Sequence, residues 1–205
     1  MGNKEDSQFK KVLKGSWDYT GLIYTTTNLL NQRDIQQTER GLSKNKRWKK
    51  IICNNHGCPR WVFIHYLAIH GRLATKDRLI KWNIDCSPTC PLCEAKPKSV
   101  QHLLFQCPTA HLVWEKLLMW QKMQRQVLSW DQEQKWAKDH TNRSSAKAEI
   151  YRITLSGCIY YIWQERNQRA FQSKRRTAEA IVKMIIQDVH CAGAKKARLA
   201  KILQL

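Results

Sequence analysis

The sequence predicts a mostly α-helical protein: a small helical domain with an embedded cysteine- and histidine-rich loop, followed by a helical C-terminal segment. Apolar residues recur at three- and four-residue intervals in several stretches of the chain, which is the period of an amphipathic helix. Prolines stand where two of these stretches begin, and proline is favoured in the first turn of a helix. Four of the eight cysteines lie between positions 86 and 107, in a proline-broken loop.

The elements follow in chain order. Residues 1–44 are basic and polar with few apolar positions, which predicts a weakly ordered arm. The helical domain is expected over residues 45–120. Its first helix should run from Pro59 to near Gly71, and Thr75 can cap a second, short helix because its hydroxyl can accept from a free first-turn amide.

A third helix is expected from Pro108 to about residue 120. Residues 121–144 are polar and are predicted to form a linker with one or two helical turns. Helical periodicity returns in the C-terminal segment, residues 145–191, and a basic tail, residues 192–205, completes the chain. The tryptophans at helical spacing are predicted to be core residues. They are Trp61, Trp114 and Trp163.

The chain is strongly basic. It has 36 Lys and Arg against 16 Asp and Glu, a net charge of +20, and the first fifty residues alone hold eleven of these basic residues. Such a field attracts polyanions, so nucleic acid, anionic membranes and acidic proteins are the candidate partners. Because the sequence has no secretory signal and no apolar run of about 20 residues, we expect an intracellular protein without a membrane partner. Residues 44–50 (KNKRWKK) and 173–176 (SKRR) could each act as a nuclear import signal.

One motif has the spacing of a metal site. Cys90, Cys93, His102 and Cys107 form the pattern C-x2-C-x8-H-x4-C. Clustered cysteines in a reducing compartment commonly bind metal, and zinc takes four tetrahedral thiolate or imidazole ligands. Four protein ligands leave no open position, so the motif predicts one structural Zn²⁺. Cys86 could replace Cys90 as the first ligand, although a two-residue spacer is the commoner turn.

The remaining cysteines have weaker signals. Cys53 and Cys58, with His56 between them, could form a second metal site only with ligands from elsewhere in the chain. Cys158 and Cys191 each lie in a helical pattern and are predicted to be metal-free.

The segments around the zinc motif resemble one known family. They are CPRWVFIHYLAIHGRLATKDRLIKW (58–82), CPLC (90–93) and HLLFQCPTAHLVW (102–114). They resemble the reverse-transcriptase zinc-binding domain found at the C-terminal end of plant non-LTR (LINE-type) retrotransposon polyproteins. The resemblance covers about residues 48–115, and YYIWQERNQRAF (160–171) is similar to a segment that follows this domain in the same elements.

The resemblance implies that Cys90, Cys93, His102 and Cys107 bind zinc. It also implies a nucleic-acid-binding accessory domain, with RNA favoured over DNA, and a reverse transcriptase in trans as a further partner. One feature departs from the family: Lys98-Ser99-Val100 stands where an acidic pair is usual. The chain has no Asp-Asp pair to hold the metal ions of a polymerase, so we expect the accessory domain without the polymerase, and no enzyme activity.

Basic residues near the motif and beyond it are the candidate phosphate contacts. They are Lys44, Lys46, Arg47, Lys49, Lys50, Lys96, Lys98, Arg166, Arg169, Lys174, Arg175 and Arg176. Each of these runs could instead be a solvated helix face.

Two other functions are open on the sequence alone. Asp131, Glu133 and Lys135 form D-x-E-x-K, a pattern of some metal-dependent endonucleases, but the spacing is generic and no strand is predicted around it. The domain could also be a protein-interaction scaffold. Salt dependence separates this from nucleic-acid binding, because only phosphate contacts release counterions.

Overall fold

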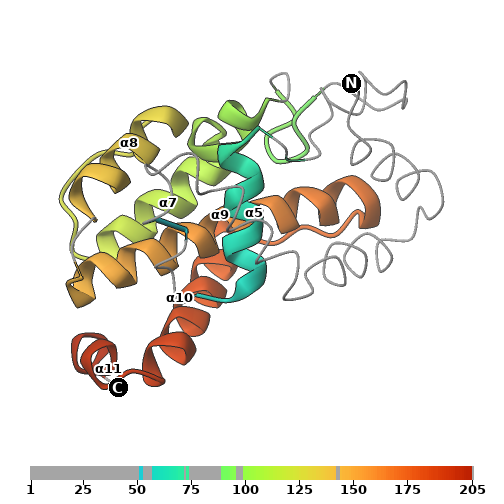
Figure 1. The fold of residues 1–205 in the computed structure, drawn as a ribbon. Helices are drawn as coiled ribbons and strands as arrows, with labels where there is room; N and C mark the ends of the chain where they lie inside the picture. The colour runs from blue at the N-terminus through green and yellow to red at the C-terminus, as the bar shows by residue number, and fades with distance from the viewer. Residues whose placement is uncertain are drawn as a thin grey trace, which may run out of the picture. The chain divides into compact units, whose positions relative to one another are not determined.

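The computed structural model describes residues 51–52, 57–71, 73, 89–95, 99–141 and 144–204, which belong to one compact unit, Asn45–Leu205. The described residues are mostly helical and contain no β-strand, which confirms the predicted fold class (Figure 1). The elements are α5 (Pro59–Ile69), η1 (His102–Gln106), α7 (Pro108–Trp120), α8 (Trp130–His140), α9 (Ala146–Gln172), α10 (Ala178–Ala194) and α11 (Ala197–Leu203). The predicted N-terminal arm and the short helix predicted after Thr75 lie outside the described residues.

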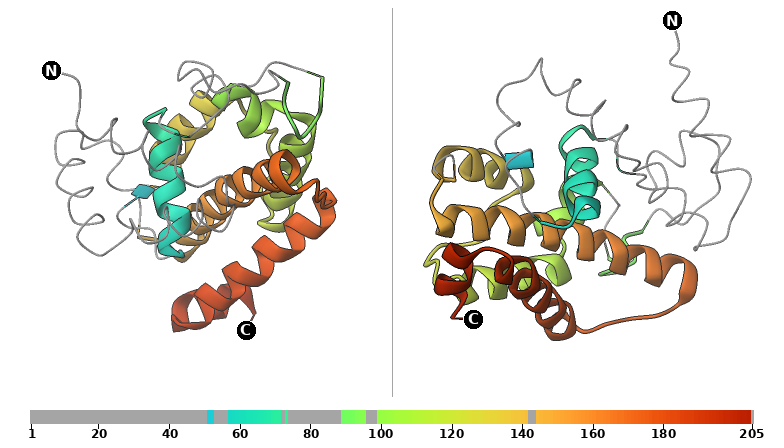
Figure 2. Two further views of the ribbon diagram at one scale, coloured as in Figure 1. Left: turned by 90° about the vertical axis from the view of Figure 1, so that its right-hand side faces the viewer. Right: turned by 60° about the horizontal axis from the view of Figure 1, so that its bottom comes forward.

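The long helix α9 lies at the centre of the packing. Helices α5, α7, α10 and α11 and the turn η1 all contact it, with α5 on one side and α10 on another (Figures 1 and 2). Every side chain from Tyr151 to Trp163 is buried, so this part of α9 has no solvent face and no single apolar stripe. Gly157 permits a close approach of α5 to α9, because a Cβ there would lie 3.1 Å from Cζ3 of Trp61.

The helix starts are those that the local sequence predicts. Pro59 and Pro108 occupy the first turns of α5 and α7, where a missing N–H costs nothing. The side-chain hydroxyls of Ser145 and Thr177 cap α9 and α10, each accepting a 3.2 Å hydrogen bond from the backbone N–H three residues later. After α5 ends, Gly71 has a φ of +60°, a conformation that glycine adopts without strain.

One hydrophobic core joins the first helices to the C-terminal segment. Its buried members run along the chain from Ile51 to Leu199. Trp61, Trp114 and Trp163 are only 3%, 0% and 6% exposed, which confirms that they are core residues.

The segment predicted as a polar linker, residues 121–144, contains the three-turn helix α8, longer than the one or two turns expected. Trp130 begins this helix and its ring stacks on Phe105 with a centroid distance of 6.1 Å. The buried residues of α8 are Trp130, Ala137, Glu133 and Gln134, and the last two find hydrogen-bond partners there. Few apolar residues therefore mark this helix in the sequence.

The residues predicted as a basic tail also differ from expectation, because residues 197–203 form helix α11. Leu199 of this helix is fully buried, and Lys196 and Arg198 form ion pairs with the buried carboxylate of Glu149 near the start of α9. The basic side chains therefore hold the chain end against α9.

Among the described residues, none of the helices combines the length and the apolar character that crossing a bilayer requires.

Candidate metal centre

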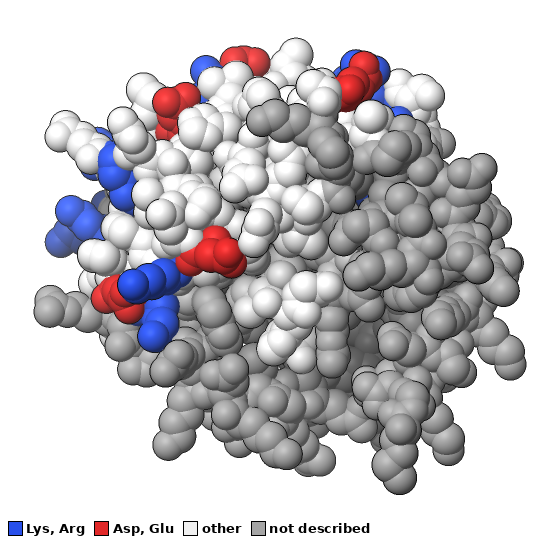
Figure 3. Space-filling view, turned by 90° about the horizontal axis from the view of Figure 1, so that it is seen from above, with Lys and Arg blue, Asp and Glu red and all other residues white. Residues whose placement is uncertain are grey.

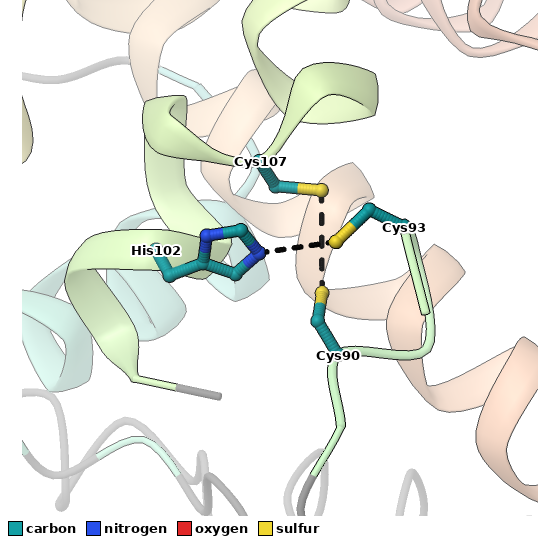
Figure 4. Close-up of side chains that lie close together, drawn as sticks. All are labelled: Cys90, Cys93, His102 and Cys107. Atoms are coloured by element: carbon teal, nitrogen blue, oxygen red, sulfur yellow. Dashed lines mark hydrogen bonds between the residues drawn. The ribbon is translucent and has the colours of Figure 1, made fainter. Parts of the chain in front are cut away.

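Two short segments bring the predicted metal ligands together. Cys90 and Cys93 lie on a turn before η1, His102 begins η1, and Cys107 lies between η1 and α7. Figure 4 shows the three sulfur atoms and Nε2 of His102 pointing toward a common centre. All four ligand atoms lie within 4.8 Å of one another.

The distances fit a tetrahedral zinc site. Sγ of Cys90 lies 4.0 Å from Sγ of Cys107, and Sγ of Cys93 lies 3.3 Å from Nε2 of His102. For zinc–sulfur bonds of about 2.3 Å and zinc–nitrogen bonds of about 2.0–2.1 Å, tetrahedral geometry requires edges of roughly 3.8 Å and 3.6 Å. The donor set of three thiols and one imidazole is that of a structural zinc site, and four protein donors close the coordination shell.

Hydrogen bonds, acting against the effect of burial, favour the thiolate of one buried cysteine. Cys90 and Cys107 are fully buried, His102 is 5% exposed and Cys93 is half-buried. The hydrogen bond with Cys107 and those with the backbone of Cys93 and Leu92 lower the pKa of Cys90, because they favour its thiolate. The same contact raises the pKa of Cys107, so these hydrogen bonds favour one thiolate of the pair, and thiolates are the form of cysteine that binds zinc.

The segment between His102 and Cys107 anchors the site to the core. Leu103, Leu104 and Phe105 are at most 2% exposed, so this apolar stretch anchors the metal loop to the helices. The backbone N–H of Cys107 donates to the carbonyl of His102 at 2.6 Å and closes the turn. Phe105 has a φ of +75°, a strained conformation for an aromatic residue, and its ring packs against Trp114 at a centroid distance of 5.5 Å.

The other cysteines stand apart from this cluster. Among the described residues, Cys158 is buried and Cys191 is exposed, and neither joins the group of possible ligands. Burial raises the pKa of Cys158, so its thiol stays protonated. The alternative ligand Cys86, and Cys53 with His56, lie outside the described residues.

The structure corrects two of the predicted phosphate contacts. Arg166 is 2% exposed and donates to Oδ1 of Asn167, and the side chain of Arg169 is 10% exposed and forms an ion pair with Glu165. A phosphate contact needs an accessible guanidinium, so neither residue is available for one. Arg166 is buried and Arg169 is half-buried on α9, and the basic pattern of the sequence gave no sign of either.

The other candidate contacts divide into two groups. Lys174 and Arg175 are exposed and Arg176 is half-buried in the loop between α9 and α10, and Arg175 forms an exposed ion pair with Glu94. The rest lie outside the described residues. They are Lys44, Lys46, Arg47, Lys49, Lys50, Lys96 and Lys98.

The acidic residues of the nuclease pattern do not form a site in the described part of the chain. Glu133 is fully buried, where it accepts hydrogen bonds from Arg125 at 3.0 Å and from the Tyr151 hydroxyl at 2.5 Å. Asp131 is exposed and accepts from Gln101 instead. The carboxylate of Glu133 therefore has a structural role between α8 and α9, which periodicity analysis did not predict.

A family model described as zinc-binding in reverse transcriptase matches residues 25–114. That range contains all four residues of the cluster and ends within α7. Comparisons with curated proteins and with solved structures found no match. The match and the cluster agree on the same chemistry, so residues 25–114 of this chain are similar to the zinc-binding domain in reverse transcriptase.

Proposed function

We propose that this protein is a nucleic-acid-binding module whose fold is stabilised by one zinc ion, and that it prefers RNA to DNA. The observation that supports it is the Cys₃His cluster inside the family match. In this proposal Cys90, Cys93, His102 and Cys107 hold the ion. When bound, zinc supplies folding free energy to a loop that is too short to fold by apolar burial alone.

The positive charge of the chain supports nucleic acid as the partner. The net charge is +20, and eleven Lys and Arg stand against five Asp and Glu in residues 1–50. On the face drawn in Figure 3, Lys and Arg of the described residues lie beside Asp and Glu around a largely uncharged centre. We assign phosphate binding to the basic runs of the chain, including Lys174, Arg175 and Arg176.

The wider context follows from the same proposal. The domain would be an accessory part of a non-LTR retrotransposon reverse transcriptase, acting without polymerase or nuclease activity of its own. A reverse transcriptase in trans and the element's transcript are the partners that this role requires. We further propose a plant source and an intracellular, nuclear site of action, in keeping with the basic run at residues 44–50.

A salt series tests the proposal directly. Binding of the full chain to single-stranded RNA, single-stranded DNA and duplex DNA is measured from low to high salt, with zinc content determined on the same sample. We expect the logarithm of the binding constant to fall linearly with the logarithm of salt, with a slope of about −0.7 per neutralised phosphate on single strands. Binding that does not respond to salt, or no binding, would overturn it.

Charge variants identify the surface. Lys174→Gln with Arg175→Gln should reduce the salt slope by about one to two phosphate contacts. The matched control removes two exposed lysines outside the predicted contacts, Lys135→Gln with Lys147→Gln, and should leave the slope nearly unchanged. An equal decrease of the salt slope in both double variants would mean that total charge, and not this loop, determines binding.

A protein-interaction scaffold is the second candidate. Helix α7 exposes Met119 to 70% and Leu112 to 39%, and a spacing of seven residues places both on the same side of the helix. Exposed apolar residues on one helix face are typical of a protein interface. Binding of a partner that persists at high salt and is lost on Met119→Lys would favour this function.

A further inference from the structure

Arg169 connects the metal-binding turn with the long helix α9. Its Nη1 donates to the backbone carbonyl of Leu92 at 2.9 Å, although the two residues are 77 positions apart. Leu92 lies between Cys90 and Cys93, so this hydrogen bond acts on the turn that carries two of the four predicted ligands. The turn lies inside the family match and Arg169 lies outside it.

The whole guanidinium of Arg169 is used. Nε donates to Oε1 of Glu165 at 2.7 Å, and Nη2 donates to the backbone carbonyl of Arg176 at 3.0 Å. Glu165 is fully buried and also accepts from the backbone N–H of Arg176 at 2.9 Å. One planar side chain therefore joins α9, the metal turn and the basic loop at residues 173–176, which the single ammonium of a lysine cannot do.

The carbonyl of Leu92 has a second donor. The hydroxyl of Thr109, in the first turn of α7, donates to it at 3.2 Å. The turn is also closed internally, because the backbone N–H of Glu94 donates to the carbonyl of Cys90 at 2.7 Å. The Leu92 carbonyl is thus held from α7 and from α9, and of these two donors only Arg169 has a charge, which strengthens its hydrogen bond.

We propose that Arg169 is a positioning residue of the metal centre: it holds the Cys90–Cys93 turn in its metal-binding form and couples this turn to the basic loop at residues 173–176. The inference rests on zinc binding by the cluster and does not require that the protein binds nucleic acid. Coupling between two sites is reciprocal. If the contact with the loop increases the affinity for the metal, metal binding should stabilise the ordered form of the loop by the same free energy. The exposed ion pair between Arg175 and Glu94 adds little, because solvent screens it.

The test compares Arg169→Lys with Arg125→Lys in the full chain. Arg125 also forms an ion pair with a buried glutamate, Glu133. Arg125→Lys therefore keeps the positive charge and weakens a buried arginine–glutamate pair, as Arg169→Lys does, but away from the metal centre. Zinc affinity is measured by competition with a chelator, without nucleic acid. We expect Arg169→Lys to weaken zinc binding about tenfold or more, because loss of a group that orients metal ligands typically has an effect of this size. Arg125→Lys should lower the melting temperature and leave the zinc affinity unchanged.

Limited trypsin digestion measures the coupling to the loop. Cleavage after Lys174 and Arg175, followed by mass spectrometry, should become several-fold faster in wild-type protein when zinc is removed. In Arg169→Lys the cleavage should be fast with or without zinc. If Arg169→Lys does not fold, Thr109→Val tests the same carbonyl, and a smaller loss of zinc affinity is expected.

The outcomes separate the two proposals. Equal zinc affinity in wild-type protein and Arg169→Lys, or equal losses in Arg169→Lys and Arg125→Lys, overturns the positioning role. Loop cleavage that does not respond to zinc overturns the coupling. A protein that binds zinc with the expected difference between variants, and binds no nucleic acid, upholds this inference while the proposed function fails. Absence of zinc binding in wild-type protein overturns both.

Discussion

Nδ1 of His65 lies 2.8 Å from the hydroxyl oxygen of Ser156, although 91 residues separate them in the sequence. The other ring nitrogen, Nε2, lies 3.1 Å from Oε1 of Gln134. One fully buried imidazole therefore connects α5 to both α8 and α9. Both ring nitrogens have partners, so the ring is held in one orientation without a charge.

The stability of the fold should depend on the protonation of His65. Burial lowers the pKa of this imidazole from 6.5 to about 4, because the charged form loses its hydration. Between these values the unfolded chain binds the proton and the folded chain does not. The free energy of unfolding should therefore fall as the pH falls from 6.5 to 4, by up to about 3 kcal/mol.

Urea unfolding across this pH range measures the effect. The zinc ligands also take up protons in acid, so the informative quantity is the difference between wild-type protein and His65→Gln. We expect the variant to be less stable at pH 7 and to lose less stability on acidification. The exposed His140→Gln is the control and should follow the wild-type curve; parallel curves for His65→Gln would contradict the prediction.

Removal of one predicted zinc ligand should unfold the metal loop. Cys93→Ser leaves three donors in the cluster, and because zinc binding is part of the folding free energy, both the metal and cooperative unfolding should be lost. Metal analysis and thermal unfolding followed by circular dichroism measure the two effects. The exposed Cys191→Ser should retain a full complement of zinc. Retention of zinc by Cys93→Ser would exclude this ligand.

The buried carboxylate of Glu133 should be essential for stability and not for catalysis. Glu133→Ala removes the carboxylate that pairs with the Arg125 guanidinium. The Arg125 side chain is only 16% exposed, and loss of one partner of a buried ion pair typically costs about 3–5 kcal/mol. The exposed Asp131→Asn should change stability by less than about 0.5 kcal/mol. Chemical denaturation measures both. Divalent-ion-dependent cleavage of labelled duplex by wild-type protein, lost in a folded Glu133 variant, would restore the nuclease hypothesis.

The C-terminal helix should depend on one buried glutamate. Glu149 is fully buried and forms ion pairs with Lys196 and Arg198. Glu149→Gln should therefore loosen α11 and lower the free energy of unfolding by about 1–3 kcal/mol. Hydrogen exchange should speed up over residues 197–203 before other helices are affected. The exposed pair between Lys116 and Glu179 provides the control, because Glu179→Gln should have almost no effect. Unchanged exchange in α11 would show that its other contacts, such as the buried Leu199, are enough to hold this helix.

Much of the fold follows from local features of the sequence. The helix starts at Pro59, Pro108, Ser145 and Thr177 depend on residues within one turn, and the core tryptophans repeat at helical spacing. Helix α8 was underestimated because its buried face carries Glu133 and Gln134, whose partners come from other parts of the chain. Trp130 and Ala137 are the apolar residues that α8 buries, and two such residues are too few to predict its full length.

The sequence by itself determined the helical class and the four residues that converge on the candidate zinc centre, because helix periodicity and ligand spacing are short-range properties of a chain. Only the tertiary structure decided which charges are available for binding. Arg169 and Glu133 are indistinguishable in the sequence from exposed residues such as Arg175 and Asp131. Burial depends on which distant segments pack together, and the hydrogen bond from Arg169 to Leu92 exists only once α9 meets the metal turn.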